Sequence, residues 1–379
     1  MKSFSMSNAY PLVRFLVPFS LLFCLAGCSD RKAASAGPGP SAAGTGKKSV
    51  PVFVPATSGF STHSSATAVN GKKKPDDAQV KDAGAPTAEE AKSVYLAGED
   101  PVFARKNGWP VKSPAQLPGA IMPKKRIVAY YGNPLSKRMG ALGEYEQKEM
   151  LHRLKAEAKR WSEADPSVPV LPALHLIAVV AQGEAGKAGK YRMLMPDEIV
   201  NQVYGWAREA NCLLFIDIQT GHEDIRTLLP RFEWILKNPD VHLGIDPEFN
   251  LVASKKVPGT RIGTFDAADI NFVTGYLKDL VTKYHLPPKV LTVHRFTRNG
   301  LTNYRRVVLR PEVQIVMNMD GWGGPHLKRA SYQDYIVTEP VQFAGFKLFY
   351  HNDTKKGDPL MMPKDVLRLK PRPFYIMYQ

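Results

Sequence analysis

From about residue 120 onward, short apolar runs alternate with longer amphipathic segments. The apolar runs have the length of strands and are apolar almost throughout, as strands buried on both faces are. Eight such runs span residues 126–132, 170–180, 212–219, 241–249, 289–296, 313–321, 346–353 and 373–379. Apolar residues recur every three to four positions between them, which is typical of one face of a helix. Helices are predicted at 142–164, 196–210 and 266–284, with weaker ones near 223–237, 301–309, 329–337 and 362–369.

Eight strand–helix units in about 260 residues predict an α/β fold of the (β/α)8 TIM-barrel type. An open, doubly wound sheet is the alternative. It is disfavoured because no glycine-rich phosphate loop follows the first strand. Asp266 is the expected N-cap of the helix at 266–284, because an aspartate there accepts a hydrogen bond from the first turn.

The N-terminus has the order of an exported lipoprotein. Lys2 and Arg14 precede an apolar run at 15–26 that is shorter than a membrane-spanning helix. The next element, Leu-Ala-Gly-Cys ending at Cys28, resembles a bacterial lipobox. That resemblance implies cleavage before Cys28, lipidation of Cys28 and a membrane anchor. By the same resemblance, Ser29 favours the outer membrane if the cell is Gram-negative.

The segment after Cys28 differs in composition from the rest of the chain. It is rich in Ala, Gly, Ser, Pro and Thr and poor in large apolar residues, so it cannot bury enough surface to offset its ordering entropy. It is predicted to be a disordered tether in the cell envelope. The expected organisation is a signal peptide (1–27), this tether (28–95), a lead-in segment (96–119) and the barrel domain (120–379).

The net charge indicates which molecules the protein could bind, and the cysteine content indicates whether it has a disulfide. The formal net charge is +16, which suits anionic envelope polymers such as acidic glycans or phosphate-bearing lipids. No nucleic-acid motif is present, so nucleic acid is not an expected partner. Signal cleavage would remove Cys24 and lipidation would use Cys28, which leaves Cys212 as a buried apolar residue without a disulfide. We expect a monomer without a cofactor.

Acidic residues close three of the predicted strands: Asp217, the pair Asp246 and Glu248, and Asp320. The carboxyl ends of barrel strands form one mouth, so these side chains are expected to converge there. Strand periodicity would point Asp246 and Glu248 to the barrel axis together with Gly244.

Converging carboxyl groups suit glycoside hydrolysis, which needs an acid of raised pKa and a second carboxylate. Repulsion between neighbouring acids raises the pKa of one of them. Glu248, which has the longest reach, is the expected general acid, and Asp246 would orient it or polarise the substrate. Asp217 and Asp320 complete the predicted catalytic set. Substrate contacts are predicted for Tyr131, Gln219, His294, Asn318, Trp322 and Tyr350.

Two short stretches resemble chitinase-type barrels. Asp246-Pro247-Glu248 is similar to the terminal D-x-E of those enzymes, and Met317-Asn318-Met319-Asp320 is similar to their M-x-Y-D element. The resemblance implies that Glu248 is the acid, that Asp246 positions a substrate acetamido group acting as nucleophile, and that Asp320 assists.

The chain departs from that pattern at several positions. Val241 and Gly244 stand where the earlier acids would be, Met319 replaces the tyrosine, and Tyr378 stands where a tryptophan ends the last strand. Most of the barrel, from Tyr130-Tyr131-Gly132 through Asp246-Pro247-Glu248, also resembles a group of uncharacterised bacterial lipoproteins. That second resemblance implies no activity.

Three functions therefore remain open. The barrel would bind and hydrolyse a glycan, bind a glycan without cleaving it, or act as a metal-dependent phosphodiesterase. In the last case the strand-end acids would hold Mg²⁺ or Ca²⁺ through oxygen, and His294-Arg295 would meet a phosphate. The first two need no metal. His175, on a strongly apolar run, is interpreted as a hydrogen-bonded core histidine.

Overall fold

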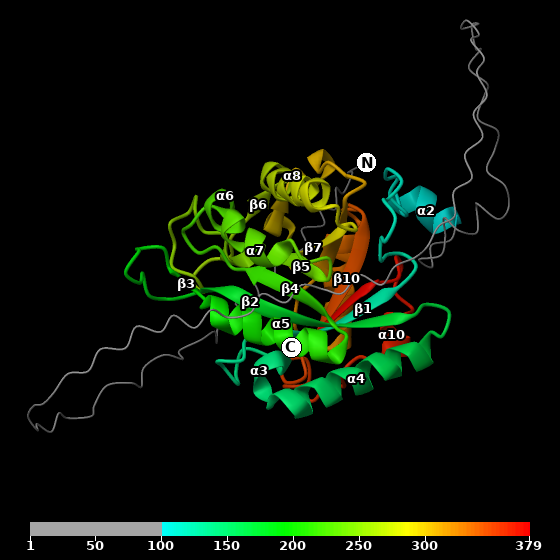
Figure 1. Ribbon diagram of the computed structural model, residues 1–379. Coiled ribbons are helices and arrows are strands. Elements are labelled where there is room, and N and C mark those ends of the chain that lie inside the picture. Colours follow the sequence, from blue (N-terminus) through cyan, green and yellow to red (C-terminus); the bar gives the residue numbers. More distant parts are fainter. Residues whose placement is uncertain (1–100) are drawn as a thin grey trace, which may run out of the picture. The chain divides into compact units, whose positions relative to one another are not determined.

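The computed structural model describes residues 101–379. The predicted signal peptide, Cys28, the whole predicted tether and the first five residues of the predicted lead-in segment lie outside this range. Eight parallel strands close into a barrel, because the first strand pairs with both the second and the last (Figure 1). The predicted (β/α)8 fold is confirmed. The barrel strands are β1 (Arg126–Gly132), β2 (Val170–Ala181), β4 (Leu213–Ile218), β5 (Val241–Ile245), β7 (Lys289–Arg295), β9 (Val313–Met319), β10 (Phe343–Leu348) and β11 (Tyr375–Tyr378).

Three short strands lie outside the closed ring. β3 (Arg192–Leu194) pairs antiparallel with the end of β2. β6 (Phe265–Asp266) and β8 (Leu301–Thr302) form a parallel pair of their own. They extend the carboxyl-terminal loops of the barrel, where a site is expected.

Helices connect the strands and cover the barrel in Figure 1. Asp266 accepts a hydrogen bond from the backbone N–H of Ala268, and its own N–H donates to Asp269, so the predicted cap is confirmed as a capping box. The α-helices are α2 (Pro101–Asn107), α3 (Ala141–Glu144), α4 (Gln147–Ala164), α5 (Asp197–Ala210), α6 (Ile225–Leu228), α7 (Glu233–Leu236), α8 (Ala267–Tyr284), α9 (Pro325–Tyr332) and α10 (Pro363–Val366). Tighter or wider turns occur at η1 (Leu229–Phe232), η2 (Pro247–Phe249), η3 (Arg298–Gly300), η4 (Tyr304–Arg306) and η5 (Gln333–Val337).

The structure corrects three predicted elements. The run at 241–249 stops being a strand at Ile245, because Pro247 has no N–H for the ladder and begins the 3₁₀ turn η2. The strand predicted at 346–353 begins at Phe343 and ends at Leu348 instead. The helix predicted near 301–309 is β8 followed by the short turn η4.

Polar side chains occupy the inside of the barrel among aromatic ones. His175 stacks on Phe215 at 5.1 Å between ring centroids, and Tyr375 meets Phe215 edge to face at 5.2 Å. Tyr131 lies against His175 and His294, with centroids at 5.3 and 5.5 Å. Buried polar groups are stable only when they are paired, so this interior must satisfy each of them.

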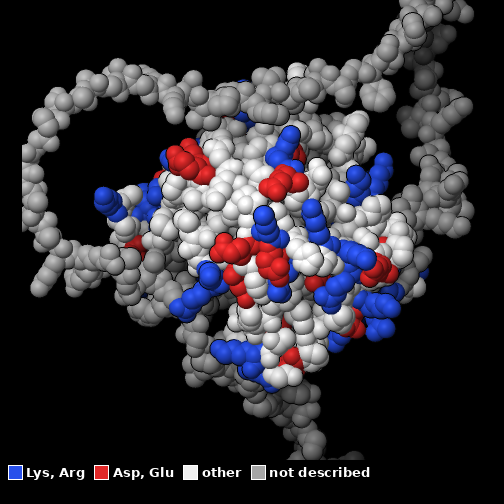
Figure 2. All heavy atoms as spheres, turned by 60° about the horizontal axis from the view of Figure 1, so that its bottom comes forward, with Lys and Arg blue, Asp and Glu red and all other residues white. Residues whose placement is uncertain are grey.

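Charged residues of both signs are mixed on the face shown in Figure 2. On α4, Arg153 pairs with Glu149 and Lys159 with Glu163, each four residues apart. The positive net charge is therefore not gathered into a single basic patch on this face. Within residues 101–379, no helix combines the length and the apolar character needed to cross a membrane.

Candidate functional site

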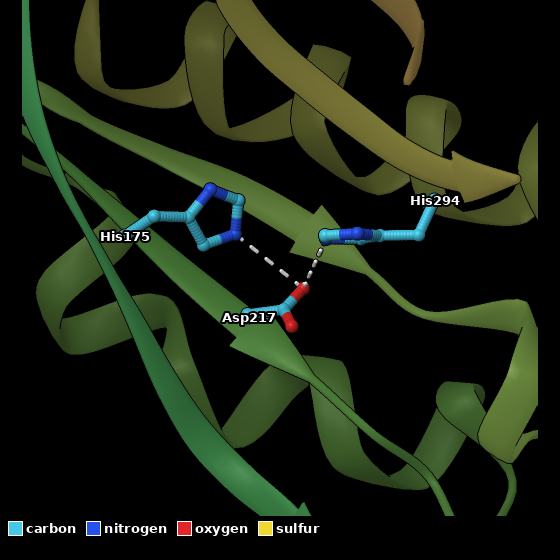
Figure 3. Close-up of side chains that lie close together, drawn as sticks. All are labelled: His175, Asp217 and His294. Atoms are coloured by element: carbon cyan, nitrogen blue, oxygen red, sulfur yellow. Dashed lines mark ion pairs between the residues drawn. The ribbon is translucent and has the colours of Figure 1, made fainter. Parts of the chain in front are cut away.

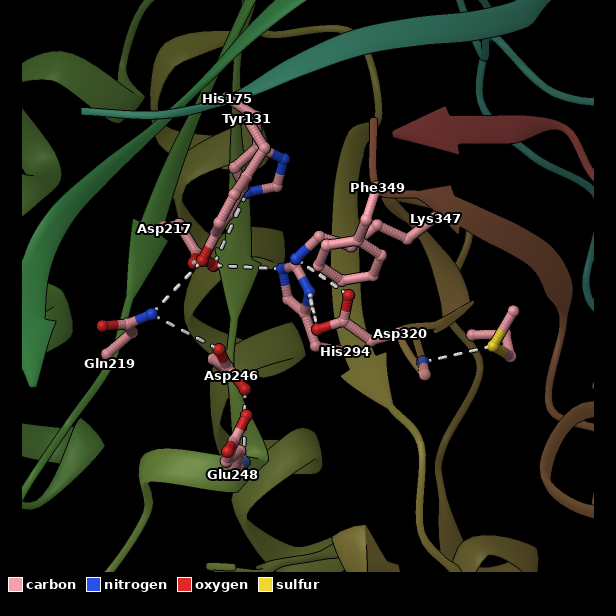
Figure 4. Close-up of polar contacts among 12 residues, drawn as sticks. Tyr131, His175, Asp217, Gln219, Asp246, Glu248, His294, Asp320, Lys347 and Phe349 are labelled. Carbon is pink, nitrogen blue, oxygen red and sulfur yellow. Dashed lines mark hydrogen bonds and ion pairs between the residues drawn. The ribbon is translucent and has the colours of Figure 1, made fainter. Parts of the chain in front are cut away.

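Asp217 lies at the centre of a buried polar cluster inside the barrel (Figure 4). Its Oδ2 accepts a hydrogen bond from the Tyr131 hydroxyl at 2.9 Å. Its Oδ1 lies 3.5 Å from His175 Nε2 and 3.5 Å from His294 Nε2. Three side chains, from strands β1, β2 and β7, thus meet at the carboxylate of Asp217 on β4.

A second carboxylate, Asp320, follows β9 and is held by two cations. His294 Nδ1 lies 3.0 Å from Asp320 Oδ2, and the Lys347 ammonium lies 2.8 Å from Oδ1. Lys347 also sits over the Tyr131 ring, 4.0 Å from its centroid. A buried lysine is stable when a carboxylate pairs with it, and Asp320 supplies that charge.

The pair that follows β5, Asp246 and Glu248, lies below Asp217 in Figure 4, and Gln219 lies beside both Asp217 and Asp246. Gln219 donates to the Tyr131 hydroxyl at 3.3 Å and to Asp246 Oδ2 at 3.5 Å. Asp246 Oδ1 accepts from the backbone N–H of Glu248 at 3.2 Å, as the N-cap of η2. The turn, rather than strand periodicity, therefore sets the direction of Glu248.

The four carboxyl groups fall into two electrostatic classes. Burial favours the neutral form of each. At Asp217 this effect is outweighed by the charges and contacts of His294 and His175 together, and at Asp320 by those of Lys347 and His294 together. The pKa values of these two acids are lowered. At Asp246 and Glu248 the charges of His294 and Lys347 compensate only in part, so burial and neighbouring acids raise the pKa values of these two acids to about 7 and about 8.

The histidines are divided in the same way. Burial would lower the pKa of His294, but Asp320 and Asp217 outweigh that effect and raise it to about 10. Burial dominates at His175 and lowers its pKa to about 4 despite the nearby Asp217. The cluster thus contains a charged and a neutral imidazole on the two sides of one carboxylate.

The structure brings most of the sequence-predicted site residues together and leaves three apart. Asn318 is buried inside the barrel, where its Oδ1 lies close to Gly345 of β10. Trp322 is 43% exposed in the segment after β9. Tyr350 stacks on Tyr378 and its hydroxyl lies 3.0 Å from that of Tyr130. The sugar contacts assigned to these three residues stay predictions. The residues that do converge are Asp217, Gln219, Asp246, Glu248, His294, Asp320 and Tyr131.

Two residues of the cluster were not predicted from sequence to be functional. His175 was interpreted as a core histidine, yet its Nε2 faces Asp217. Lys347 lies in the middle of the apolar run Phe346-Lys347-Leu348, where a lysine is costly unless it is paired. A lysine in such a run therefore indicates a buried partner of opposite charge.

The donor atoms of this cluster also suit a metal ion. His175, Asp217 and His294 each place one donor atom within 4.8 Å of the others, and so do Asp246, His294 and Asp320. The first group has an imidazole–imidazole–carboxylate composition. The second has two carboxylates and shares His294 with the first. The site could thus serve two kinds of chemistry through different atoms. Asp246 and Glu248 suit acid–base chemistry, and the group that contains His175 suits metal binding.

Comparison with known proteins adds little to this description. No protein-family model and no curated protein matches the sequence. One solved structure, described as "a putative alpha-L-fucosidase" from Bacteroides thetaiotaomicron, aligns with 70% of this chain and 91% of its own chain. The sequence identity is 9% and the TM-score is 0.35. So distant a likeness says nothing about a substrate.

Proposed function

We propose that the barrel binds a glycan at its carboxyl-terminal mouth and hydrolyses a glycosidic bond there, with Glu248 as the general acid. The observation that carries this proposal is the convergence of four strand-end carboxyl groups with pKa values displaced in opposite directions. Glycosidases need that division, because one carboxyl group must donate a proton while another remains ionised.

Glu248 suits the acid role by position as well as by proton affinity. It is the most accessible of the four carboxyl groups, since the other three are buried. Its pKa is raised to about 8, so it carries a proton at neutral pH. Among residues 101–379, no lysine, arginine or histidine lies within ion-pair distance of it. Glu248 can therefore give its proton to a leaving oxygen without first breaking an ion pair.

Asp246 is the proposed partner of Glu248. Its pKa near 7 leaves part of it ionised at neutral pH, and Gln219 contacts its Oδ2. It can orient a substrate group or stabilise positive charge on the sugar. Asp217 and Asp320 are already compensated by His294 and Lys347, so their proposed role is to maintain the field around Asp246.

Binding without cleavage is the second candidate. It is favoured by the enclosure of Asp246 and Asp320, which are 3% and 7% exposed. A sugar would reach Glu248 more easily than it would reach either of them. We further propose that Cys28 carries a lipid anchor, that the protein resides in the cell envelope, and that the glycan belongs to that compartment or its surroundings.

The test is a comparison of wild-type protein with Glu248→Gln on peptidoglycan and chitooligosaccharides. We expect cleavage by the wild type and a loss of roughly 10²–10⁴-fold in the variant, the usual contribution of a general acid. Glu163→Gln, at an exposed position on α4, is the matched control and should leave cleavage unchanged. Equal cleavage by Glu248→Gln removes Glu248 from the acid role. Binding by the wild type without cleavage favours the second candidate.

A further inference from the structure

Three polar atoms from three strands face one another inside the barrel without ordinary partners (Figure 3). They are His175 Nε2, Asp217 Oδ1 and His294 Nε2, and none has a hydrogen bond to another described residue. The three residues are 0–2% exposed. Leaving such atoms unsatisfied costs about 1–3 kcal/mol each, more for a charged group, so an unpaired set of three calls for an occupant.

The separations between these atoms indicate what the occupant is. Asp217 Oδ1 lies 3.5 Å from each imidazole nitrogen. Direct N–H···O bonds span about 2.7–3.2 Å, so these contacts are too long. Two ligands of a tetrahedral zinc ion, at bonds of about 2.0–2.2 Å, lie roughly 3.4 Å apart. Two partners of a bridging water at about 2.8 Å lie roughly 4.6 Å apart. The observed spacing is close to the metal value.

The remaining atoms of the three side chains are held as metal ligands usually are. His294 Nδ1 faces Asp320 at 3.0 Å, and His175 Nδ1 faces the Tyr375 hydroxyl at 2.6 Å. The second oxygen of Asp217 accepts from Tyr131. Such outer contacts fix the ring orientation. His294 is charged without an ion, so an ion would displace the proton on its Nε2 when it binds there.

Gly244 keeps the space beside these atoms open. It lies on β5 directly across from Asp217. A Cβ at this position would lie 2.5 Å from Asp217 Oδ1 and 2.8 Å from His175 Cε1, and closer still to His175 Nε2. Any other residue would therefore fill the space that the donor atoms face. Glycine in a strand is otherwise unfavourable, and close approach of a ligand is one reason to retain it.

We propose that His175, Asp217 and His294 bind one divalent transition-metal ion of the zinc class. Two imidazoles and one carboxylate suit zinc and similar ions, whereas Mg²⁺ and Ca²⁺ prefer oxygen ligands alone. The alternative group built on Asp246 and Asp320 is less suitable, because the Lys347 ammonium already neutralises Asp320. The proposed ion joins strands β2, β4 and β7 and is independent of Glu248.

The test uses the full chain, stripped with a chelator and then supplied with Zn²⁺, or with Co²⁺ as a spectroscopic probe. We expect one ion per chain after gel filtration, a visible Co²⁺ spectrum of low coordination number, and a Tm that rises by several degrees with Zn²⁺ but not with Mg²⁺. Wild-type protein that retains no ion and shows no Zn²⁺-dependent Tm overturns the proposal.

Variants locate the ion. Asp217→Asn, His175→Gln and Gly244→Ala should each lose the bound ion and the Zn²⁺-dependent rise in Tm. His152→Gln, on the exposed face of α4, is the matched control and should retain both. Unchanged metal content in a folded Asp217→Asn or His175→Gln variant contradicts the assignment. Glu248→Gln should keep its ion, so a failed glycosidase assay and a failed metal assay give separate answers.

Discussion

Gly244→Ala tests the packing of the site directly, because it places one methyl group in the space that the atoms of His175 and Asp217 face. The new Cβ would lie 2.5 Å from Asp217 Oδ1 and 2.8 Å from His175 Cε1. Carbon atoms in good contact lie about 3.5–4.0 Å apart, so the overlap is about 1 Å on two sides. Neither neighbour yields easily, because His175 is held by Tyr375 and by its stacking on Phe215.

The expected cost follows from that overlap. Inserting a methyl group into a packed core costs about 1–3 kcal/mol, and displacing Asp217 from Tyr131 adds the loss of a buried hydrogen bond. We expect Gly244→Ala to lower the free energy of unfolding by about 2–4 kcal/mol. The same change at Gly205, an exposed position in α5 with no atom within 4 Å of its added Cβ, should raise stability by about 0.5–1 kcal/mol.

Urea denaturation followed by far-UV circular dichroism measures both variants against the wild type. The opposite signs are the decisive result, since the chemical change is identical and only the surroundings differ. Equal m-values would confirm that the difference lies in stability rather than in compactness. Ordinary surface substitutions change the free energy of unfolding by about 0.5 kcal/mol or less. A change that small for Gly244→Ala would refute the packing argument.

Three further predictions concern charge and capping. The pKa of Glu248 is raised from 4.5 to about 8, so its neutral form stabilises the fold below pH 4.5, and that contribution is lost as the pH rises through 8. Glu248→Gln should therefore unfold at higher urea than the wild type at pH 9 but not at pH 4.5. Lys347→Met removes a cation from Asp320 and should cost about 3 kcal/mol in urea titrations at pH 7; a neutral result would contradict the ion-pair argument. Asp266→Ala, which removes the cap of α8, should lower stability by about 1–2 kcal/mol in the same assay, with an unchanged midpoint counting against the cap.

Local sequence was sufficient to predict those elements whose structure depends on residues close to them in the chain. The run at 126–132 is strand β1 with the predicted bounds, and Asp266 caps α8 as its residue type predicts. Eight apolar runs separated by helical periodicity were enough to predict a barrel. These features depend on burial pattern and on hydrogen bonds within a few residues, both of which a single sequence displays.

Strand ends were predicted less well, because they depend on turn chemistry and on register with neighbouring strands. Pro247 ends β5 and places Asp246 at the cap of a turn, so the expected alternation does not extend to Glu248. The strand around Lys347 begins three residues before the predicted run at 346–353 and ends five residues before it does. Its bounds are set by pairing with β9 and β11, which no local pattern reveals.

The sequence by itself determined the fold class, most of the strands, and the presence of acids at the carboxyl-terminal mouth. Only the tertiary structure decided that His175 and His294 face the same oxygen of Asp217, that Lys347 neutralises Asp320, and that Gly244 leaves room beside them. The reason is physical. These contacts join residues on different strands, and their energies depend on distances and burial that arise only when the barrel closes.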